Sequence, residues 1–243
     1  MNQIVESLYQ EGNPDAEAVD QFIQQNQFPL VEPGRVTFVY RGQAQAGHLR
    51  SWISGLDTAQ PLVALEASDL WALTMELPDK SRFEYKFEVE QNGVKQLVLD
   101  DLNGVLAHDP FGANSVCQGY GYKRPNWTLH DPSARSGSLD ILKIASRAFR
   151  DTREIPIYLP AQFRRNRTYP LLIVHDGLDY LHYADLKNVL DNLIHRMEIP
   201  AMIVALTNSP DRLIEYTGDE RHALFLGNRR PIKNPQLRVF YCS

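Results

Sequence analysis

The histidines of this sequence are the first side chains to consider for chemistry, because an imidazole can transfer protons near neutral pH or bind a metal ion. None forms an H-E-x-x-H pattern, and none pairs with a cysteine at the spacing of a zinc site. The spacing therefore predicts no metal centre. His175 is open to two interpretations, a catalytic residue or a neutral imidazole bonded to backbone. The histidines are His48, His108, His130, His175, His182, His195 and His222.

Serine and cysteine are the next candidates, because a hydroxyl or thiol activated by a base can attack a carbonyl carbon. No serine lies in G-x-S-x-G, the pattern that exposes a nucleophile on a sharp strand-to-helix turn. Ser115-Val-Cys117-Gln-Gly119 faintly resembles that pattern, but no such turn is predicted there. We interpret Cys117 as a buried structural residue, since a free cysteine behaves as a small hydrophobe.

Arg212 and Glu215 carry opposite charges in the segment after a predicted strand. Charges on a loop suit contact with a substrate, and a guanidinium can hold an anionic group. The two residues could instead form an ion pair with each other that braces the loop. Both alternatives remain open at this point.

The elements that must position these residues begin with a helical segment within residues 1–30. Asn13 can cap the helix, and Pro14 suits its first position. Its apolar stripe is formed by Val19, Phe22 and Ile23.

The short strand patterns within residues 31–118, separated by turn signals, predict a small β-sandwich of immunoglobulin-like size. Phe83–Val89 alternates apolar and charged side chains, as a strand with one buried face must. Asn92-Gly93 follows, which is a strong signal for a hairpin because both central residues of a type I′ turn need positive φ. Residues 119–138 lack periodicity and predict a linker that packs through its aromatic side chains. Further strands are expected at Val36–Arg41, Leu70–Leu77 and Val94–Leu99.

The second half has a different pattern, which predicts strands alternating with a helix. Leu139–Ile144 and Glu154–Leu159 are expected to pair antiparallel. Asp185–Met197 has an apolar stripe at helical spacing, between the buried strands Pro170–Val174 and Ala201–Leu206. A strand, a helix and a second strand at this distance form a βαβ unit with parallel strands. A hairpin followed by βαβ is how an α/β-hydrolase sheet begins.

Composition limits the partners that we expect. A net charge of −5 disfavours nucleic acid and anionic membrane surfaces. No signal peptide is visible and no apolar run reaches the ~20 residues that span a bilayer, so we expect a cytoplasmic protein without a membrane partner. Two cysteines, Cys117 and Cys242, make no disulfide framework. The oligomeric state cannot be read from the sequence.

Several motifs resemble the enterochelin-esterase-like members of the esterase D branch of α/β-hydrolases. In the second half they are Tyr169–Asp179 (YPLLIVHDGLD), Asn208–Tyr216 (NSPDRLIEY) and Arg221–Leu226 (RHALFL). In the first half they include Phe38–Gly42, Trp52, Leu70-Trp71, Leu77-Pro78, Arg82–Lys86, Asp100–Asn103 and Asp109–Gly112. The order of these motifs carries the resemblance, which covers residues from about Arg35 to Leu226.

The resemblance implies a carboxylic-ester hydrolase with a Ser-His triad, and a catecholate siderophore as one candidate ester substrate. It implies no metal or organic cofactor for the chemistry. The segment His175-Asp176-Gly177-Leu178 matches the loop that contributes to the oxyanion hole, and we assign the backbone N–H to Leu178. Arg212, and Glu215 with it, would lie on the substrate side.

The sequence also departs from that family. Residues 139–226 resemble only the first part of the hydrolase domain, and neither the nucleophile nor the later histidine follows. Pro231 and Pro235 cannot sit inside the expected helix, so we interpret residues 227–243 as an aberrant tail; a genuine short tail is the alternative. We therefore expect a truncated member that is inactive as given, with an open apolar edge on the Ala201–Leu206 strand.

Two other functions remain open. The front domain also resembles carbohydrate-binding modules, so the chain could be a non-catalytic binding module for a glycan or a siderophore. Trp52 and Trp71 would then form a sugar-binding face, although we favour their packing in the core of the sandwich. The remaining possibility is a gene product without function.

Overall fold

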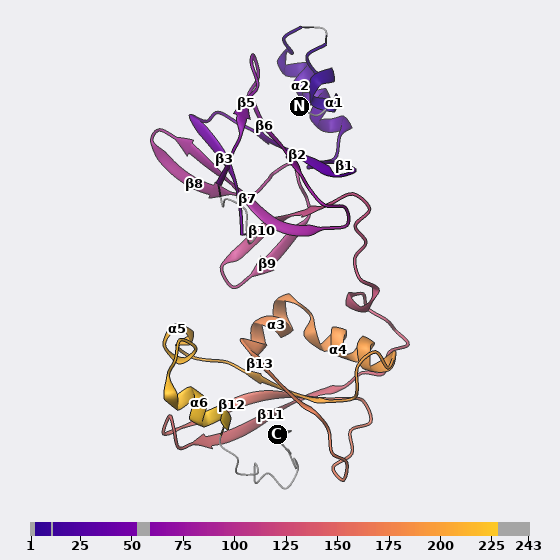
Figure 1. The fold of residues 1–243 in the computed structure, drawn as a ribbon, viewed down its shortest axis with the longest axis vertical. Coiled ribbons are helices and arrows are strands. Elements are labelled where there is room, and N and C mark those ends of the chain that lie inside the picture. The colour runs from indigo at the N-terminus through magenta and orange to yellow at the C-terminus, as the bar shows by residue number, and fades with distance from the viewer. Residues whose placement is uncertain (1–2, 11, 53–58, 228–243) are drawn as a thin grey trace. The chain divides into compact units, whose positions relative to one another are not determined.

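The computed structural model describes residues 3–10, 12–52 and 59–227, and it divides into two compact units, Met1–Lys123 and Arg124–Ser243 (Figure 1). No described helix is both long enough and apolar enough to cross a membrane. Cys242 and nearly all of the tail that we interpreted as aberrant lie outside the described residues.

Two short helices open the first unit, α1 (Gln3–Ser7) and α2 (Ala16–Gln25). The predicted cap, Asn13, is wrong: Asp15 caps α2, and its Oδ1 accepts the N–H of Ala18 at 2.8 Å. A carboxylate that reaches a free amide of the first turn satisfies a donor that the helix itself cannot pair. The predicted apolar stripe of α2 is buried through Val19 and Phe22.

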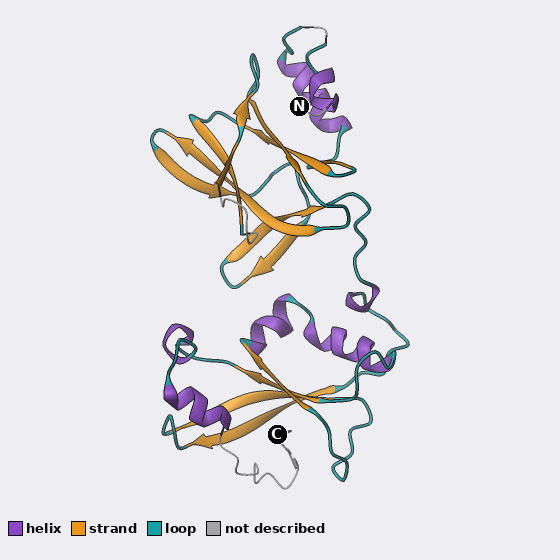
Figure 2. Cartoon of the chain, in the orientation of Figure 1, coloured by secondary structure: helices purple, strands orange, loops and turns teal. Residues whose placement is uncertain are grey.

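Two antiparallel sheets make up the rest of the first unit (Figure 2). The first has the order β1-β2-β6-β5, and the second has the order β4-β3-β7-β10-β9, with β8 paired to β7. The strands are β1 (Leu30–Glu32), β2 (Arg35–Arg41), β3 (Ala46–Ser51), β4 (Ala59–Pro61), β5 (Val63–Ala64), β6 (Leu70–Glu76), β7 (Arg82–Gln91), β8 (Val94–Val98), β9 (Leu106–Asp109) and β10 (Gly112–Gln118).

The main core of this unit takes side chains from both sheets. Phe38 of β2 and Tyr85 of β7 are fully buried, and their ring centroids lie 4.7 Å apart. β7 alternates buried and outward residues along its length, so its predicted one-sided burial is confirmed. The predicted β7–β8 hairpin is also confirmed, and Asn92 and Gly93 both have positive φ, at 52° and 74°.

Cys117 is fully buried in this core, and burial raises the pKa of its thiol to about 12. A thiol that stays protonated at neutral pH is a poor nucleophile. The structure therefore supports the interpretation of Cys117 as a packing residue.

A buried polar network fastens the loop after β8 to the core. The Tyr85 hydroxyl donates to Asp100 Oδ2 at 2.5 Å, and Asn103 Nδ2 donates to Tyr85 Oη at 3.0 Å. The backbone N–H of Asp100 donates to Ser115 Oγ at 2.9 Å. Burial raises the pKa of Asp100 to about 6, although the bond from Tyr85 opposes that rise.

We expect Asp100 to make the first unit less stable as the pH rises. The folded unit holds the proton up to about pH 6, whereas the ordinary pKa is 3.8, so the free energy of unfolding falls across that interval. About 1.4 kcal/mol per pKa unit makes the loss about 3 kcal/mol. Urea unfolding between pH 4 and pH 7 should show this fall in the wild type and a shallower one in Asp100→Asn. Glu66→Gln, which removes an exposed carboxylate elsewhere in the first unit, is the control; an equal slope in all three proteins would contradict the expectation.

The second unit has one four-stranded sheet in the order β11-β12-β14-β13. β11 and β12 pair antiparallel, as predicted, and β13 and β14 pair parallel around two helices, which confirms the predicted βαβ unit. The elements are η1 (Asn126–Thr128), β11 (Ser138–Ser146), β12 (Asp151–Leu159), β13 (Leu171–His175), α3 (Gly177–Tyr183), α4 (Leu186–His195), β14 (Ile203–Thr207), α5 (Arg212–Glu215) and α6 (Glu220–Gly227).

The prediction that the Ala201–Leu206 strand has an open edge is wrong. β14 lies inside the sheet, between β12 and β13, and the edge strands among the described strands of this sheet are β11 and β13. After β13 the chain crosses over and returns as β14 between β13 and β12. Both edges of β14, the more deeply buried of the two parallel strands, are therefore paired. Val204 and Leu206 are fully buried, whereas Leu172 of β13 is partly exposed.

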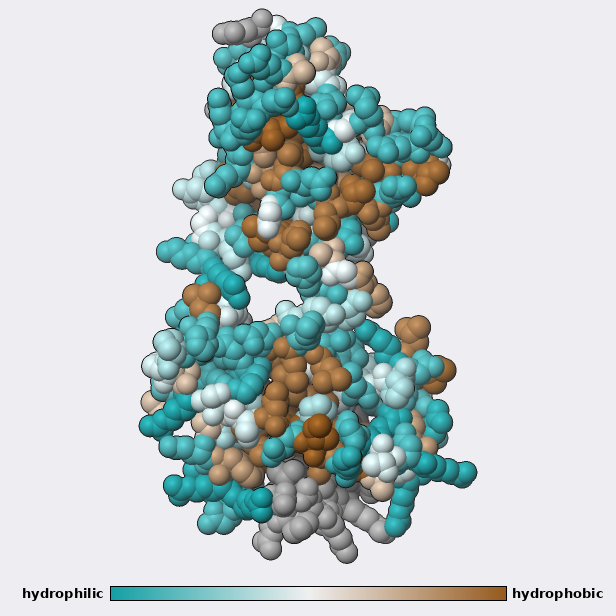
Figure 3. Space-filling view, turned by 180° about the vertical axis from the view of Figure 1, so that it is seen from behind, coloured by the Kyte–Doolittle hydropathy of each residue, from teal (hydrophilic) through white to brown (hydrophobic). Residues whose placement is uncertain are grey.

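Apolar side chains line both faces of this sheet. Tyr158, Val204 and Leu206 pack with Leu190 of α4 on one face. Leu142, Ile155, Ile157 and Ile203 form the cluster on the other face. Figure 3 shows that apolar side chains, drawn in brown, also reach the surface of both units.

The segment before β11 is tied down through polar groups rather than through its aromatic rings. Tyr120 and Trp127 are exposed, although the sequence led us to expect that they pack. Buried Asp191 of α4 accepts bonds from the N–H of Gly137 at 2.8 Å and from the hydroxyl of Tyr158 at 2.8 Å. Lys187 Nζ donates to Asp191 Oδ2 at 2.7 Å. Burial would raise the pKa of Asp191, but these donors hold it below its ordinary value.

Candidate functional site

The candidate site lies at the carboxyl ends of β13 and β14, where ligands bind in many parallel sheets. His175 and Thr207 end the two strands and are partners in the parallel register. Thr207 Oγ1 and His175 Nδ1 lie at hydrogen-bond distance, 3.2 Å apart. The hydrogen-bond partner of His175 is therefore a side chain, the hydroxyl of Thr207, and not the backbone group that one of the two interpretations proposed.

Leu178 lies in the first turn of α3 rather than in the loop that the sequence suggested. Asp176 makes the turn alone, with φ 51° and ψ 37° in the left-handed region. The helix can start at once because Gly177 has no side chain: a Cβ there would lie 2.4 Å from Leu206 Cβ. This contact places the start of α3 directly against β14.

The backbone N–H of Leu178 donates to Asn208 Oδ1 at 3.1 Å. An amide held at a strand end can stabilise negative charge on a substrate oxygen without reorganising. Here the carboxamide oxygen of Asn208 takes the place that such an oxygen would occupy. Asn208 belongs to the Asn208–Tyr216 motif, but the sequence analysis predicted no role for it. Its position directly after a buried strand was the available signal.

Arg212 pairs with Asp176 across the site, with Nη2 3.3 Å from Oδ2. Its side chain is 50% exposed, so one side of the guanidinium faces solvent. The structure therefore joins two of the residues singled out from the sequence, Asp176 from the first strand end and Arg212 from the segment after β14.

Glu215 has a different partner from the one proposed. Both of its oxygens accept bonds from Arg153 of β12, at 2.8 Å each, and its side chain is buried. Arg153 in turn stacks on Phe149, with its guanidinium carbon 3.8 Å from the ring centroid. The alternative in which Arg212 and Glu215 pair with each other is therefore wrong: Arg153 is the partner of Glu215, and its bond lowers the pKa of Glu215 and ties α5 to β12.

Three aromatic rings pack against one another beside these charged residues. The centroids of His175, Tyr216 and His222 lie 5.0 to 5.2 Å apart. Both ring nitrogens of His222 are buried without a hydrogen-bond partner, and Nδ1 is 3.8 Å from Glu215 Oε2. Burial, and then the proximity of His175, lower the pKa of His222, although Glu215 opposes this. The described residues include no group of three or more His, Cys, Asp or Glu side chains that could hold a metal ion.

We expect the second unit to lose stability as the pH falls below 6.5, because of His222. Its pKa lies below 6.5 when folded, so the unfolded chain binds the proton more readily. The stability that the neutral ring contributes is complete above pH 6.5 and is lost in acid. Thermal melting from pH 7.5 to pH 5 should show a smaller loss in His222→Phe than in the wild type. His195→Gln, an exposed histidine on α4, should lose as much as the wild type; equal losses in all three would contradict the assignment.

We also expect Gly177→Ala to destabilise the second unit by about 3 kcal/mol, because the added carbon meets the backbone and Cβ of Leu206. Urea unfolding gives this value. Gly104→Ala is the matched control, since a Cβ there has nothing within 4 Å. An unchanged midpoint for Gly177→Ala would show that α3 can move away at little cost.

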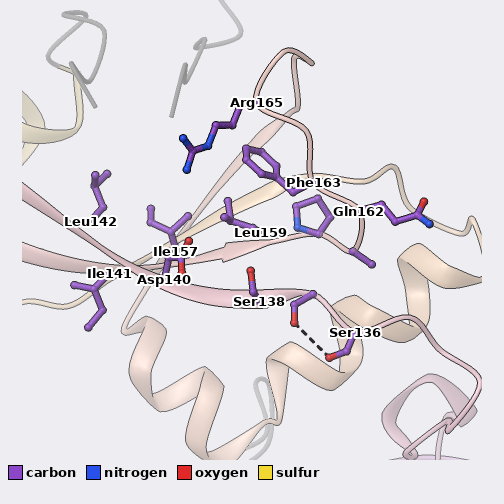
Figure 4. Close-up of a pocket in the computed structure, with 13 residues that line it drawn as sticks. Ser136, Ser138, Asp140, Ile141, Leu142, Ile157, Leu159, Gln162, Phe163 and Arg165 are labelled. Atoms are coloured by element: carbon purple, nitrogen blue, oxygen red, sulfur yellow. Dashed lines mark hydrogen bonds between the residues drawn. The ribbon is translucent and has the colours of Figure 1, made fainter. Parts of the chain in front are cut away.

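A cavity of about 690 Å³ lies elsewhere in the second unit, along β11 and the segment after β12 (Figure 4). Ser138, Leu142, Phe163 and Arg165 are among its lining residues. None of His175, Leu178, Arg212 or Glu215 lines it. The candidate site therefore rests on its chemical groups and not on this hollow.

A family model described as "Putative esterase" matches residues 146–218. No curated protein matches the chain in sequence. The enterobactin esterase of Shigella flexneri, solved in the presence of enterobactin, is 17% identical and superposes with a TM-score of 0.64 over 86% of this chain and 63% of its own. The ferric enterobactin esterase of Salmonella typhimurium is 18% identical, with a TM-score of 0.61 over 79% and 58%.

A further structure of the Shigella flexneri enzyme, solved in the presence of 2,3-dihydroxy-N-benzoyl-serine, gives a TM-score of 0.62 at 16% identity. It covers 86% of this chain and 62% of its own. This chain thus spans less than two thirds of the length of these proteins. Residues 146–218 match an esterase family, and the chain shares the fold of enterobactin esterases.

Proposed function

We propose that the first unit is an immunoglobulin-like sandwich and that the second is the opening part of an α/β-hydrolase domain. The proposed ligand is a small carboxylic ester of the catecholate siderophore type. The matched segment, residues 146–218, contains the ends of β13 and β14 and the starts of α3 and α5, whereas His222 of α6 lies beyond it. That coincidence is the observation that carries the proposal, and the shared fold supports it.

In this proposal the N–H of Leu178 receives the oxygen of the ester carbonyl, after Asn208 has released it. Arg212 holds an anionic or catecholate oxygen with its exposed side. Glu215 positions Arg212, which lies one helical turn earlier, through the bond to Arg153. Direct contact between Glu215 and the substrate stays a prediction, and its full pairing with Arg153 disfavours it.

We further propose that the chain by itself binds such esters without cleaving them by a covalent serine mechanism. No serine of the sequence lies in G-x-S-x-G. An oxyanion donor and a substrate cation can bind a ligand, but they provide no nucleophile.

Isothermal titration with 2,3-dihydroxybenzoyl-serine tests the proposal. We expect binding by the wild type, and affinity reduced by about tenfold or more in Arg212→Ala, because one charge-assisted hydrogen bond contributes about 1.5–3 kcal/mol. Arg212→Lys should retain part of the affinity. Arg167→Ala, on the loop after β12, is the matched loss of one exposed cation and should bind like the wild type.

The same protein should leave a p-nitrophenyl ester intact. Turnover that survives purification would overturn the non-catalytic part of the proposal. Absence of binding, or an equal loss in Arg212→Ala and Arg167→Ala, would overturn the assignment of the site.

A further inference from the structure

Trp52 is exposed, although the sequence favoured its burial in the sandwich core. Its side chain is 62% exposed and lines a cleft of about 380 Å³. Trp71 differs: it packs against the main core, and its Nε1 donates to the carbonyl of Gly42 at 3.2 Å. The core interpretation is therefore confirmed for Trp71 and wrong for Trp52.

The strand register explains where Trp52 lies. It directly follows β3, whose last residue, Ser51, is buried and pairs with Tyr85 of β7. Because side chains alternate between faces, Trp52 lies on the face opposite Ser51, the same face as Glu84. β7 runs between β3 and β10, so Trp52 and Asn114 flank Glu84 from its two sides.

The other groups of the cleft form a polar network beside the indole. Glu84 Oε2 accepts from Asn114 Nδ2 at 3.0 Å, and Glu84 Oε1 accepts from Arg82 Nη1 at 3.3 Å. Asn114 Nδ2 also donates to Asp109 Oδ2 at 3.2 Å, which fixes the amide. The cleft thus combines one large apolar face with a carboxylate, a carboxamide and a guanidinium that are held in place.

The charge of the cleft restricts its ligand. Its lining contains one cation and one anion, Arg82 and Glu84, which neutralise each other. A ligand with net negative charge gains little there, and Asp109 behind Asn114 repels it. A neutral ligand that carries many hydroxyls fits, because a hydroxyl both donates and accepts hydrogen bonds.

We propose that the Trp52 cleft binds a neutral saccharide. One C–H face of a pyranose ring stacks on the indole, whose π-face is negative and attracts polarised C–H groups. Vicinal hydroxyls then bond to Glu84, Arg82 and Asn114. The cleft volume lies in the range of small-molecule sites. All residues of this cleft lie in the first unit, so the saccharide proposal does not depend on the proposed ester site in the second unit.

The test is a titration of the full chain with four neutral oligosaccharides, namely maltotetraose, cellotetraose, xylotetraose and mannotetraose. Tryptophan fluorescence and isothermal titration are both read, up to about 10 mM because such binding is often weak. We expect at least one sugar to bind and to change the emission of Trp52. Affinity should fall at least about tenfold in Trp52→Ala and be largely restored in Trp52→Phe.

Trp127→Phe is the matched control. Trp127 is the tryptophan of the second unit, so this variant should bind the sugar as the wild type does and show the same change in Trp52 emission. Glu84→Ala should weaken sugar binding while Trp52 stays in place, which separates saccharide recognition from stacking alone. Failure of all four sugars to bind would overturn the proposal. So would binding that is unchanged in Trp52→Ala, or binding of 2,3-dihydroxybenzoate at this cleft in place of every sugar.

Discussion

The candidate site depends on the close approach between Gly177 and Leu206, which no residue with a side chain would permit. Because α3 starts against β14, the amide of Leu178 in the first turn of that helix lies within reach of Asn208, which directly follows the neighbouring strand. The left-handed turn at Asp176 has the same consequence, since it redirects the chain within one residue and brings its carboxylate to Arg212. One steric requirement thus places an amide donor, a carboxamide and an ion pair at a single point.

Buried charge secures the elements around that point. Arg153 and Glu215 neutralise each other through two parallel bonds, which join an antiparallel strand to the short helix α5. On the other side of the sheet, Asp191 collects donors from β12, from its own helix and from the segment before β11. A buried carboxylate is costly unless donors surround it, so each of these groups specifies one arrangement of its neighbours. Removing a partner would leave a charge in a place that water does not reach.

In the first unit, the alternation of inward and outward side chains along the strands separates apolar packing from charge pairing. Its two sheets meet through large rings such as Phe38 and Tyr85, while the outward face of β7 carries charges that pair among themselves. On such a balanced surface the exposed indole of Trp52 is a feature that packing does not explain. The two proposals therefore concern different chemistry: negative charge at strand ends in the second unit, and a neutral, hydroxylated surface in the first.

From the sequence alone one could determine the local structure and the order of the elements. Alternation in Phe83–Val89, the turn at Asn92-Gly93 and the helical stripe of Asp185–Met197 are short-range patterns, and the structure contains all three elements. The motifs around His175 and Arg212 lie in segments that the structure brings together through the Arg212–Asp176 ion pair. Only the tertiary structure decided which strand lies at the edge, which partner Glu215 takes, and whether Trp52 or Trp71 is buried. Those outcomes depend on residues distant in the chain, such as Arg153 for Glu215, and no local pattern encodes which of several possible partners is brought within bonding distance.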